Sequence, residues 1–205
     1  MQKRKVISIF LVVLLTVGMF ISAVAEPAQN VVQSNETGTI TVYARCGCGS
    51  PIENAAVVLY TRDGERAAEP SFTQQDGSII LWDIPLYGNY VIKVYASGFF
   101  PSREYEIGGD ATIFASLQPL TEDDISFVVL VTWRAWLWPG AVVEMLDTSG
   151  RVAGIAVADE DGYVVFFGVS GGPTFLINGL PAQTYFGMPG DFWNSPYANV
   201  LLRTG

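Results

Sequence analysis

The chain has 205 residues, is 50% hydrophobic and carries a formal charge of −9, from 11 Lys and Arg against 20 Asp and Glu. This length suits one large domain or two small ones, each with its own core. The acidic surface would repel phosphates, which excludes nucleic acid as a partner. The sequence contains no histidine, which excludes Ser–His and Cys–His catalysis. We therefore predict no catalytic residue, no metal and no cofactor.

Residues 1–25 are predicted to be a secretory signal peptide. A basic start, "MQKRK", precedes a long apolar run, and the small residues "AVA" stand just before Glu26. The alternative is a membrane anchor at residues 6–25, because an apolar run of about 19 residues is close to the length of a membrane span. Cleavage would remove three basic residues and lower the formal charge to −12. We expect a secreted or extracellular surface protein, with the membrane as a partner only if the segment is not cleaved.

A polar leader, residues 26–37, precedes a series of short apolar segments. "TITVYA" alternates between apolar and polar residues, and "AAVVLY", "SIILW" and "NYVIKVYA" are rich in β-branched and aromatic residues. Turn signals such as "RDGE" and "QDGS" separate them, and no window has a sustained helical period. This pattern predicts an all-β protein built as a sandwich.

The sequence repeats itself weakly at a spacing of 85 positions. At that spacing "AVV" falls on a second "AVV", "YVI" falls on "FLI", and the pair Asp76-Gly77 falls on Asp161-Gly162. The match of strand with strand and turn with turn predicts two copies of one fold. Each Asp-Gly pair predicts a tight hairpin between neighbouring strands.

The repeat predicts two β-sandwich domains, residues 38–119 and 124–205, with residues 120–123 as the linker. A linker this short is stiff, so the domains are expected to touch. The second domain is the more degenerate copy, because "SGGPTFLI" replaces "PLYGNYVI" of the first.

In the first domain, "GTITVYA", "GSPIENAAVVLY", "QQDGSIILWDIPLYGNYVIKVYASGF" and "ATIFASLQPL" follow one another in a familiar order. This order resembles the carboxypeptidase regulatory-like and collagen-adhesin B-type repeats of secreted bacterial proteins. The resemblance implies a transthyretin-like (prealbumin-like, Ig-like) sandwich of seven strands and no catalytic residues. Many B-type repeats carry an isopeptide bond from a lysine on the first strand. Here the second domain has no lysine, and Lys93 comes late in the first, so that bond is not expected.

Cys46 and Cys48 form the sequence "CGC" at the end of the first predicted strand. An oxidising compartment makes a local disulfide one possibility. Because it would close a very small ring, such a bond would be easily reduced. The pair could also remain as free thiols or form a link to another chain. Two thiolates alone leave a zinc site incomplete.

Aromatic residues are concentrated in two segments of the second domain. "TWRAWLWPG" contains Trp133, which strand alternation places at or near the core, and Trp136 and Trp138, which lie beyond the regular strand. "TYFGMPGDFWNSPY" contains Tyr185 and Trp193. These rings could pack at the open end of a sandwich or between the domains. They could also form an exposed platform for a protein or a glycan.

We therefore expect a non-catalytic protein of the cell surface with a structural or protein-interaction role. The alternative is a carbohydrate-binding module with its platform around Trp136 and Trp138.

Overall fold

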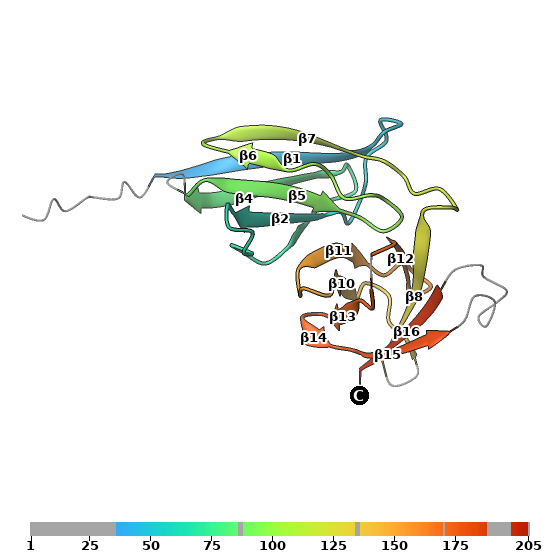
Figure 1. Cartoon of the computed structure of the whole chain (residues 1–205). Helices are drawn as coiled ribbons and strands as arrows, with labels where there is room; N and C mark the ends of the chain where they lie inside the picture. Colours follow the sequence, from blue (N-terminus) through green and yellow to red (C-terminus); the bar gives the residue numbers. More distant parts are fainter. Residues whose placement is uncertain (1–35, 86–87, 134–135, 170, 188–197, 205) are drawn as a thin grey trace, which may run out of the picture. The chain divides into compact units, whose positions relative to one another are not determined.

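All regular elements in the described part of the chain are β-strands, and they form four sheets (Figure 1). The structure is a computed structural model and describes residues 36–85, 88–133, 136–169, 171–187 and 198–204. The predicted signal peptide and most of the polar leader lie outside these residues. Within them, no helix has the length and hydropathy needed to cross a membrane.

The first sandwich consists of two sheets, ordered β4-β1-β7 and β3-β2-β5-β6. The central strand β1 pairs antiparallel with β4 and parallel with β7. The number of strands is the seven that the resemblance implies. Their bounds are β1 (Thr37–Cys46), β2 (Ala56–Thr61), β3 (Ser71–Phe72), β4 (Ser78–Pro85), β5 (Tyr90–Tyr95), β6 (Tyr105–Ile107) and β7 (Ala111–Leu117).

The core of the first sandwich follows from the alternation in its strands. In β1 every second side chain is buried, and Ile40, Val42 and Ala44 are completely so. They meet Val57 of β2 and Ile92 of β5, which come from the opposite sheet. A two-residue period thus places one face of each sheet in the core.

The second sandwich repeats this topology. Its central strand β8 pairs antiparallel with β12 and parallel with β16, as β1 does with β4 and β7. One sheet is ordered β12-β8-β16-β15, with β9 added to β8, and the other is ordered β11-β10-β13-β14. The bounds are β8 (Ile125–Trp133), β9 (Trp136–Leu137), β10 (Val142–Leu146), β11 (Val152–Val157), β12 (Tyr163–Phe167), β13 (Thr174–Ile177), β14 (Leu180–Pro181), β15 (Gln183–Gly187) and β16 (Ala198–Thr204).

The prediction of an all-β protein with two tandem sandwiches is confirmed. Strands β1–β7 pair only with one another, and so do strands β8–β16. The precise domain boundaries at 38–119 and 124–205 remain a prediction, since both sandwiches belong to one compact unit, Ser34–Gly205. The predicted linker contains an ordered turn, in which the Asp124 carboxylate accepts hydrogen bonds from the backbone N–H and hydroxyl of Thr121.

The Asp-Gly pairs form tight turns, but the predicted hairpins are wrong. The strands on either side belong to different sheets: β3 and β4 in the first sandwich, β11 and β12 in the second. Within each Asp-Gly pair only the glycine has a positive φ, which is 75° at Gly77 and 79° at Gly162. A Cβ on Gly77 would lie 2.6 Å from the carbonyl oxygen of Ala44. The glycine is required because the turn passes close to another strand while it crosses between the sheets.

Candidate functional site

The tryptophans of "TWRAWLWPG" lie on and just after a short hairpin of β8 and β9. Trp133 pairs with Trp136, and Thr132 pairs with Leu137. The Trp136 side chain is 79% exposed, Leu137 is 53% exposed and Trp133 is 46% exposed. Trp133 therefore lies at the edge of the core and not within it. We call Trp133, Trp136 and Leu137 the tryptophan hairpin.

Trp138 has a different environment from Trp136. It is partly buried and packs against the core of the second sandwich. Its ring lies 5.9 Å from that of Trp133 with an angle of 37° between the two planes. Trp138 is thus partly used for packing, whereas Trp136 is mostly exposed to solvent. Whether these residues bind a ligand remains a prediction.

The other two aromatic candidates lie largely outside the part of the chain that the structure describes. Tyr185 belongs to strand β15, but its side chain lies outside the described part of the structure. Trp193 also lies outside the described residues. Whether either residue contributes to binding remains a prediction.

Cys46 and Cys48 form a disulfide in the structure, with their Cα atoms 5.1 Å apart. Cys46 is nearly buried at the end of β1, whereas Cys48 is exposed in the following turn. That turn is closed by a hydrogen bond from the Cys46 N–H to the Ser50 carbonyl oxygen. The redox state of the pair in the protein's own environment remains a prediction.

An apolar cluster outside the two cores joins the two sandwiches. Ala56 and Val58 of β2 and Tyr95 of β5 pack with Ile155 of β11, and all four are at most 3% exposed. These side chains point away from the cores of their own sandwiches, so the outer faces of two sheets meet there. We call this contact the seam. It explains why most of β2 is buried on both faces, as the unbroken run "AAVVL" indicates.

An ion pair lies beside the apolar part of the seam. Arg66, from the loop after β2, donates hydrogen bonds to both carboxylate oxygens of Glu144 on β10. The Glu144 side chain is 6% exposed and that of Arg66 is 25% exposed. The hydrogen bond to Glu144 raises the pKa of Arg66, so this group is charged at every physiological pH.

Backbone contacts add to the seam. The Gly98 N–H donates to the carbonyl oxygen of Val165 over 3.0 Å. The Val165 N–H donates to the hydroxyl of Ser97, also over 3.0 Å. The rings of Phe100 and Phe167 lie 6.0 Å apart beside them. The first and second sandwiches are thus connected by apolar, ionic and hydrogen-bonded contacts.

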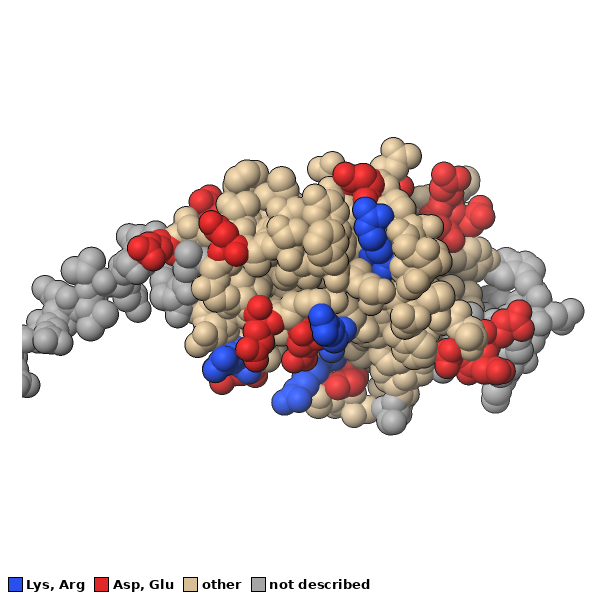
Figure 2. Space-filling view, turned by 90° about the horizontal axis from the view of Figure 1, so that it is seen from above, with Lys and Arg blue, Asp and Glu red and all other residues tan. Residues whose placement is uncertain are grey.

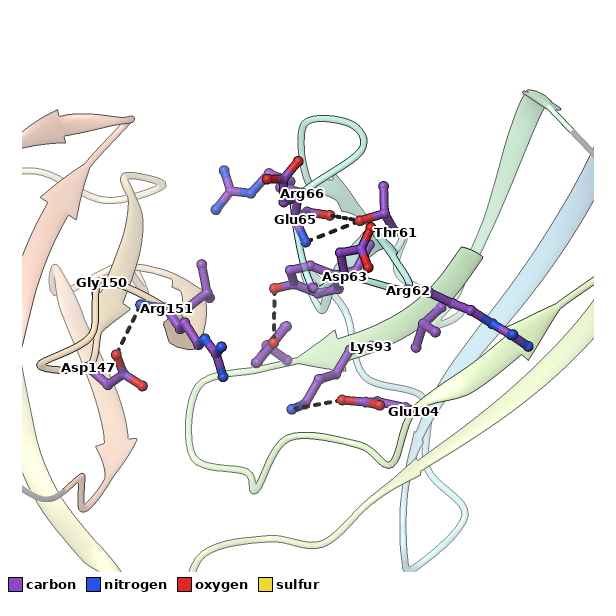
Figure 3. A pocket seen from close by; sticks show the side chains of 15 residues that line it. Thr61, Arg62, Asp63, Glu65, Arg66, Lys93, Glu104, Asp147, Gly150 and Arg151 are labelled. Atoms are coloured by element: carbon purple, nitrogen blue, oxygen red, sulfur yellow. Dashed lines mark hydrogen bonds and ion pairs between the residues drawn. The ribbon is translucent and has the colours of Figure 1, made fainter. Parts of the chain in front are cut away.

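A cavity of about 710 Å³ lies next to the seam and is lined by both sandwiches (Figure 3). Lys93 points into it beside Glu104, at 4.0 Å, and Arg151 reaches in from the second sandwich. Acidic and basic side chains line it in equal number: Arg62, Arg66, Lys93 and Arg151 with Asp63, Glu65, Glu104 and Asp147. This balance gives the cavity no strong preference for an anion or a cation.

Tyr60 and Tyr95 form part of the cavity wall, and their hydroxyls are hydrogen-bonded at 3.0 Å. Burial raises the pKa of both phenols. They stay protonated at neutral pH and cannot act as bases there. Among the residues that the structure describes, no group of three or more Cys, Asp or Glu could hold a metal ion.

Sequence reasoning missed one further aromatic surface, on the sheet β4-β1-β7 of the first sandwich. Trp82 and Phe114 are 66% and 65% exposed, and Ile80 is 45% exposed. In "SIILW" the inward and outward positions are both apolar. The usual polar signal for an outward face is therefore absent, and the sequence alone could not show which residues were exposed.

Acidic and basic side chains stand next to one another along one margin of the molecule, and further acidic groups are scattered elsewhere (Figure 2). The exposed ion pair between Arg62 and Glu106 is weak. Arg62 and Glu106 are 4.0 Å apart and more than half exposed, and such pairs contribute little to stability.

No protein-family model and no curated protein sequence matches the chain. Among solved structures, it is similar to the shaft pilin SpaA of Lactobacillus rhamnosus GG, with 11% identity, a TM-score of 0.36, and coverage of 83% of this chain and 98% of that chain. It is also similar to a Streptococcal ancillary pilin, with 15% identity, a TM-score of 0.33, and coverage of 82% and 62%. BcpA, the major pilin subunit of Bacillus cereus, gives 9% identity, a TM-score of 0.34, and coverage of 73% and 90%. All three TM-scores are below 0.5, and a likeness at that level assigns neither a family nor a function.

Proposed function

We propose that this protein is a non-catalytic structural protein of the cell surface, in which two transthyretin-like sandwiches act as one stiff body. Export by the signal peptide at residues 1–25 and the relationship to carboxypeptidase regulatory-like or collagen-adhesin B-type repeats are part of this proposal. The observation that carries it is the seam. A short, stiff linker brings the two sandwiches together, and a buried interface then fixes their orientation.

The ion pair of the seam gives this proposal an energetic basis. A carboxylate as buried as that of Glu144 is costly unless it is paired. Its partner, Arg66, comes from the other sandwich. Separation of the two sandwiches would therefore both expose the apolar cluster and break the ion pair. The two sandwiches should therefore move and unfold as a unit.

A double-mutant cycle on Arg66 and Glu144 tests the proposal. Each single change to Ala should lower the free energy of unfolding by about 3 kcal/mol, because the remaining charge is left without its partner. The double change should cost clearly less than the sum of the two. Arg62→Ala is the matched control and should cost at most about 1 kcal/mol, since that ion pair is exposed. Additive effects at Arg66 and Glu144 would contradict the proposal.

The tryptophan hairpin supports a second role, the docking of a protein partner. Trp is one of the residues that dominate protein interfaces when it inserts into a pocket. Trp136 is the most exposed of the large hydrophobic residues that the structure describes, at 79%. A stiff body that holds such a side chain at a hairpin would present it with little loss of entropy on binding.

Site-specific crosslinking tests this second role. A photoreactive residue in place of exposed Leu137, which leaves Trp136 intact, should capture one specific protein when the chain is on its own cells, and the same residue at exposed Thr148 should not. Soluble parent protein and Trp136→Phe should compete with the capture, whereas Trp136→Ala should not. Equal competition by Trp136→Ala would show that the hairpin does not bind the captured protein.

A further inference from the structure

The outer face of the sheet β4-β1-β7 is unusually rich in exposed apolar side chains. Tyr43 lies opposite Phe114 in the register of β1 and β7, and their rings stack at 5.2 Å with only 11° between the planes. On the other side of β1, strand β4 contributes Ile80 and Trp82 to the same face. We call Tyr43, Ile80, Trp82 and Phe114 the aromatic face.

This face is free of packing partners in the described structure. The opposite side of the same sheet faces the first core, and the seam uses the other sheet of that sandwich. Trp82 and Phe114 are both about two-thirds exposed. Outward positions of an antiparallel sheet are normally polar, and an exposed aromatic cluster is typical of a binding surface.

The polar side chains of the face narrow the chemistry of its ligand. In these three strands as described, charge is confined to Arg45 at the end of β1 and Asp83 at the irregularity between β4 and β1, although the chain carries a charge of −9. The remaining outward positions are hydroxyl residues, which can donate and accept hydrogen bonds: Thr39, Thr41, Ser78, Thr112 and Ser116. Flat rings surrounded by hydroxyl groups and few charges complement a neutral ligand that has both C–H faces and hydroxyls.

The size of the face argues against a second protein as the stable occupant. Three strands about 4.8 Å apart, each with about seven residues at about 3.4 Å, cover roughly 350 Å². A stable protein interface needs about 800 Å² on each partner. A single row of sugar rings needs much less.

A hollow lies beside the edge strand of this sheet, at the margin between the two sheets, because the core residues Val57 and Leu59 of β2 also line it. A cavity of about 310 Å³ lies along β4, and Ile80, Leu81 and Trp82 line it together with Ala68 from the loop before β3. Trp82 thus belongs both to the aromatic face and to the wall of a recess. This arrangement could stack one ring of a ligand and hold a substituent beside it.

We propose that the aromatic face binds a neutral, unbranched polysaccharide, with the ring of Trp82 stacked on one sugar ring and the mutually stacked pair of Tyr43 and Phe114 in contact with the chain beside it. The C–H groups of a pyranose pack against an aromatic ring, and the surrounding hydroxyls orient the sugar. This site differs from the tryptophan hairpin in position, shape and ligand, and it goes beyond the proposed structural role.

Sedimentation of the full chain with suspended microcrystalline cellulose and with chitin tests the proposal. The parent should bind at least one of these neutral polysaccharides and should not bind alginate beads, which are anionic. Trp82→Ala should weaken binding about tenfold, the loss expected for one stacked ring and its buried area. Phe114→Ala should weaken it less, because the Phe114 ring is stacked on Tyr43. Trp82→Phe should retain most of the binding.

Trp136→Ala is the matched control and should bind like the parent, because it removes an exposed indole from the other sandwich. Circular dichroism and the melting temperature should be unchanged in Trp82→Ala, since this side chain is mostly exposed. Failure of the parent to bind both neutral polysaccharides would overturn the proposal, and so would equal binding by Trp82→Ala. Concentration-dependent self-association that Trp82→Ala abolishes would also overturn it, in favour of a second copy as the occupant. None of these results affects the seam, which the Arg66–Glu144 cycle tests separately.

Discussion

The two sandwiches share one topology but expose their aromatic side chains in different ways. In the first, Tyr43 and Phe114 stack nearly parallel on the outer face of a sheet, with 11° between the rings. In the second, Trp133 and Trp138 are tilted by 37°, and Trp136 projects from a short hairpin. The comparison shows that a repeated framework determines where strands lie but not where binding residues are placed.

The seam explains part of this difference. The apolar part of the seam uses the outer face of one sheet in each sandwich: β3-β2-β5-β6 in the first and β11-β10-β13-β14 in the second. Strand β12, from the other sheet of the second sandwich, adds the contacts of Val165 and Phe167. In the first sandwich the outer face of β4-β1-β7 is left for a ligand. In the second, the added strand β9 carries the exposed indole. One stiff body would thus present two surfaces of different shape.

The largest expected effect comes from breaking the seam itself. Ile155→Ala should lower the free energy of unfolding by about 2–5 kcal/mol, the range for truncation of a fully buried aliphatic side chain. Ile80→Ala is the control, and it should cost about 1 kcal/mol or less because that side chain is 45% exposed. Chemical denaturation measures both. A loss at Ile155 no greater than that at Ile80 would mean that the two outer sheet faces do not pack together.

A smaller effect should separate the two neighbouring tryptophans of the second sandwich. Trp138→Ala should cost about 2 kcal/mol, because this ring packs partly against the core. Trp136→Ala should cost less than about 1 kcal/mol, because its ring is mostly in solvent. Thermal unfolding of the two variants gives the comparison. Equal losses would argue that Trp136 is a packing residue and not a docking residue.

The smallest effect concerns acidic turn residues that occur in both sandwiches. Hydrogen bonds from Ser78 lower the pKa of Asp76, and hydrogen bonds from Ser149 lower the pKa of Asp147. A lowered folded-state pKa contributes stability above the ordinary carboxyl value, and this contribution is lost as the pH falls through the folded value. Ser78→Ala and Ser149→Ala should therefore each raise the pKa of the neighbouring carboxyl group. NMR titration of the side-chain carboxyl carbons measures this, and an unchanged carboxyl pKa in either variant would show that the serine hydroxyl does not stabilise that carboxylate.

The fold was largely predictable because its signals are local. The alternation in "TITVYA" placed Ile40 and Val42 in a core, and the repeat placed Asp76-Gly77 and Asp161-Gly162 at equivalent turns. The prediction of hairpins was wrong because a tight turn does not show whether the strands beside it share a sheet. That choice depends on long-range pairing, which an Asp-Gly pair does not encode.

The surfaces were less predictable. The run "AAVVLY" predicted a strand, but nothing local showed that Ile155 would cover its outer side. "SIILW" is apolar at every position after the first, so alternation could not show that Trp82 points outward. Arg66 and Glu144 are 78 positions apart, and their pairing depends on the docking of two sheets. Residues that act through contacts between distant strands leave little trace in local patterns.

The central claim is that the two sandwiches form one stiff body, and a distance distribution between them tests it most directly. Spin labels can be attached to ketone-bearing residues introduced at Asn89 and Glu160, which are exposed on the first and second sandwich. Pulsed electron–electron double resonance on the full chain should give one narrow distance distribution. The combined changes Arg66→Ala and Ile155→Ala should broaden it. A broad distribution in the parent protein would contradict the account.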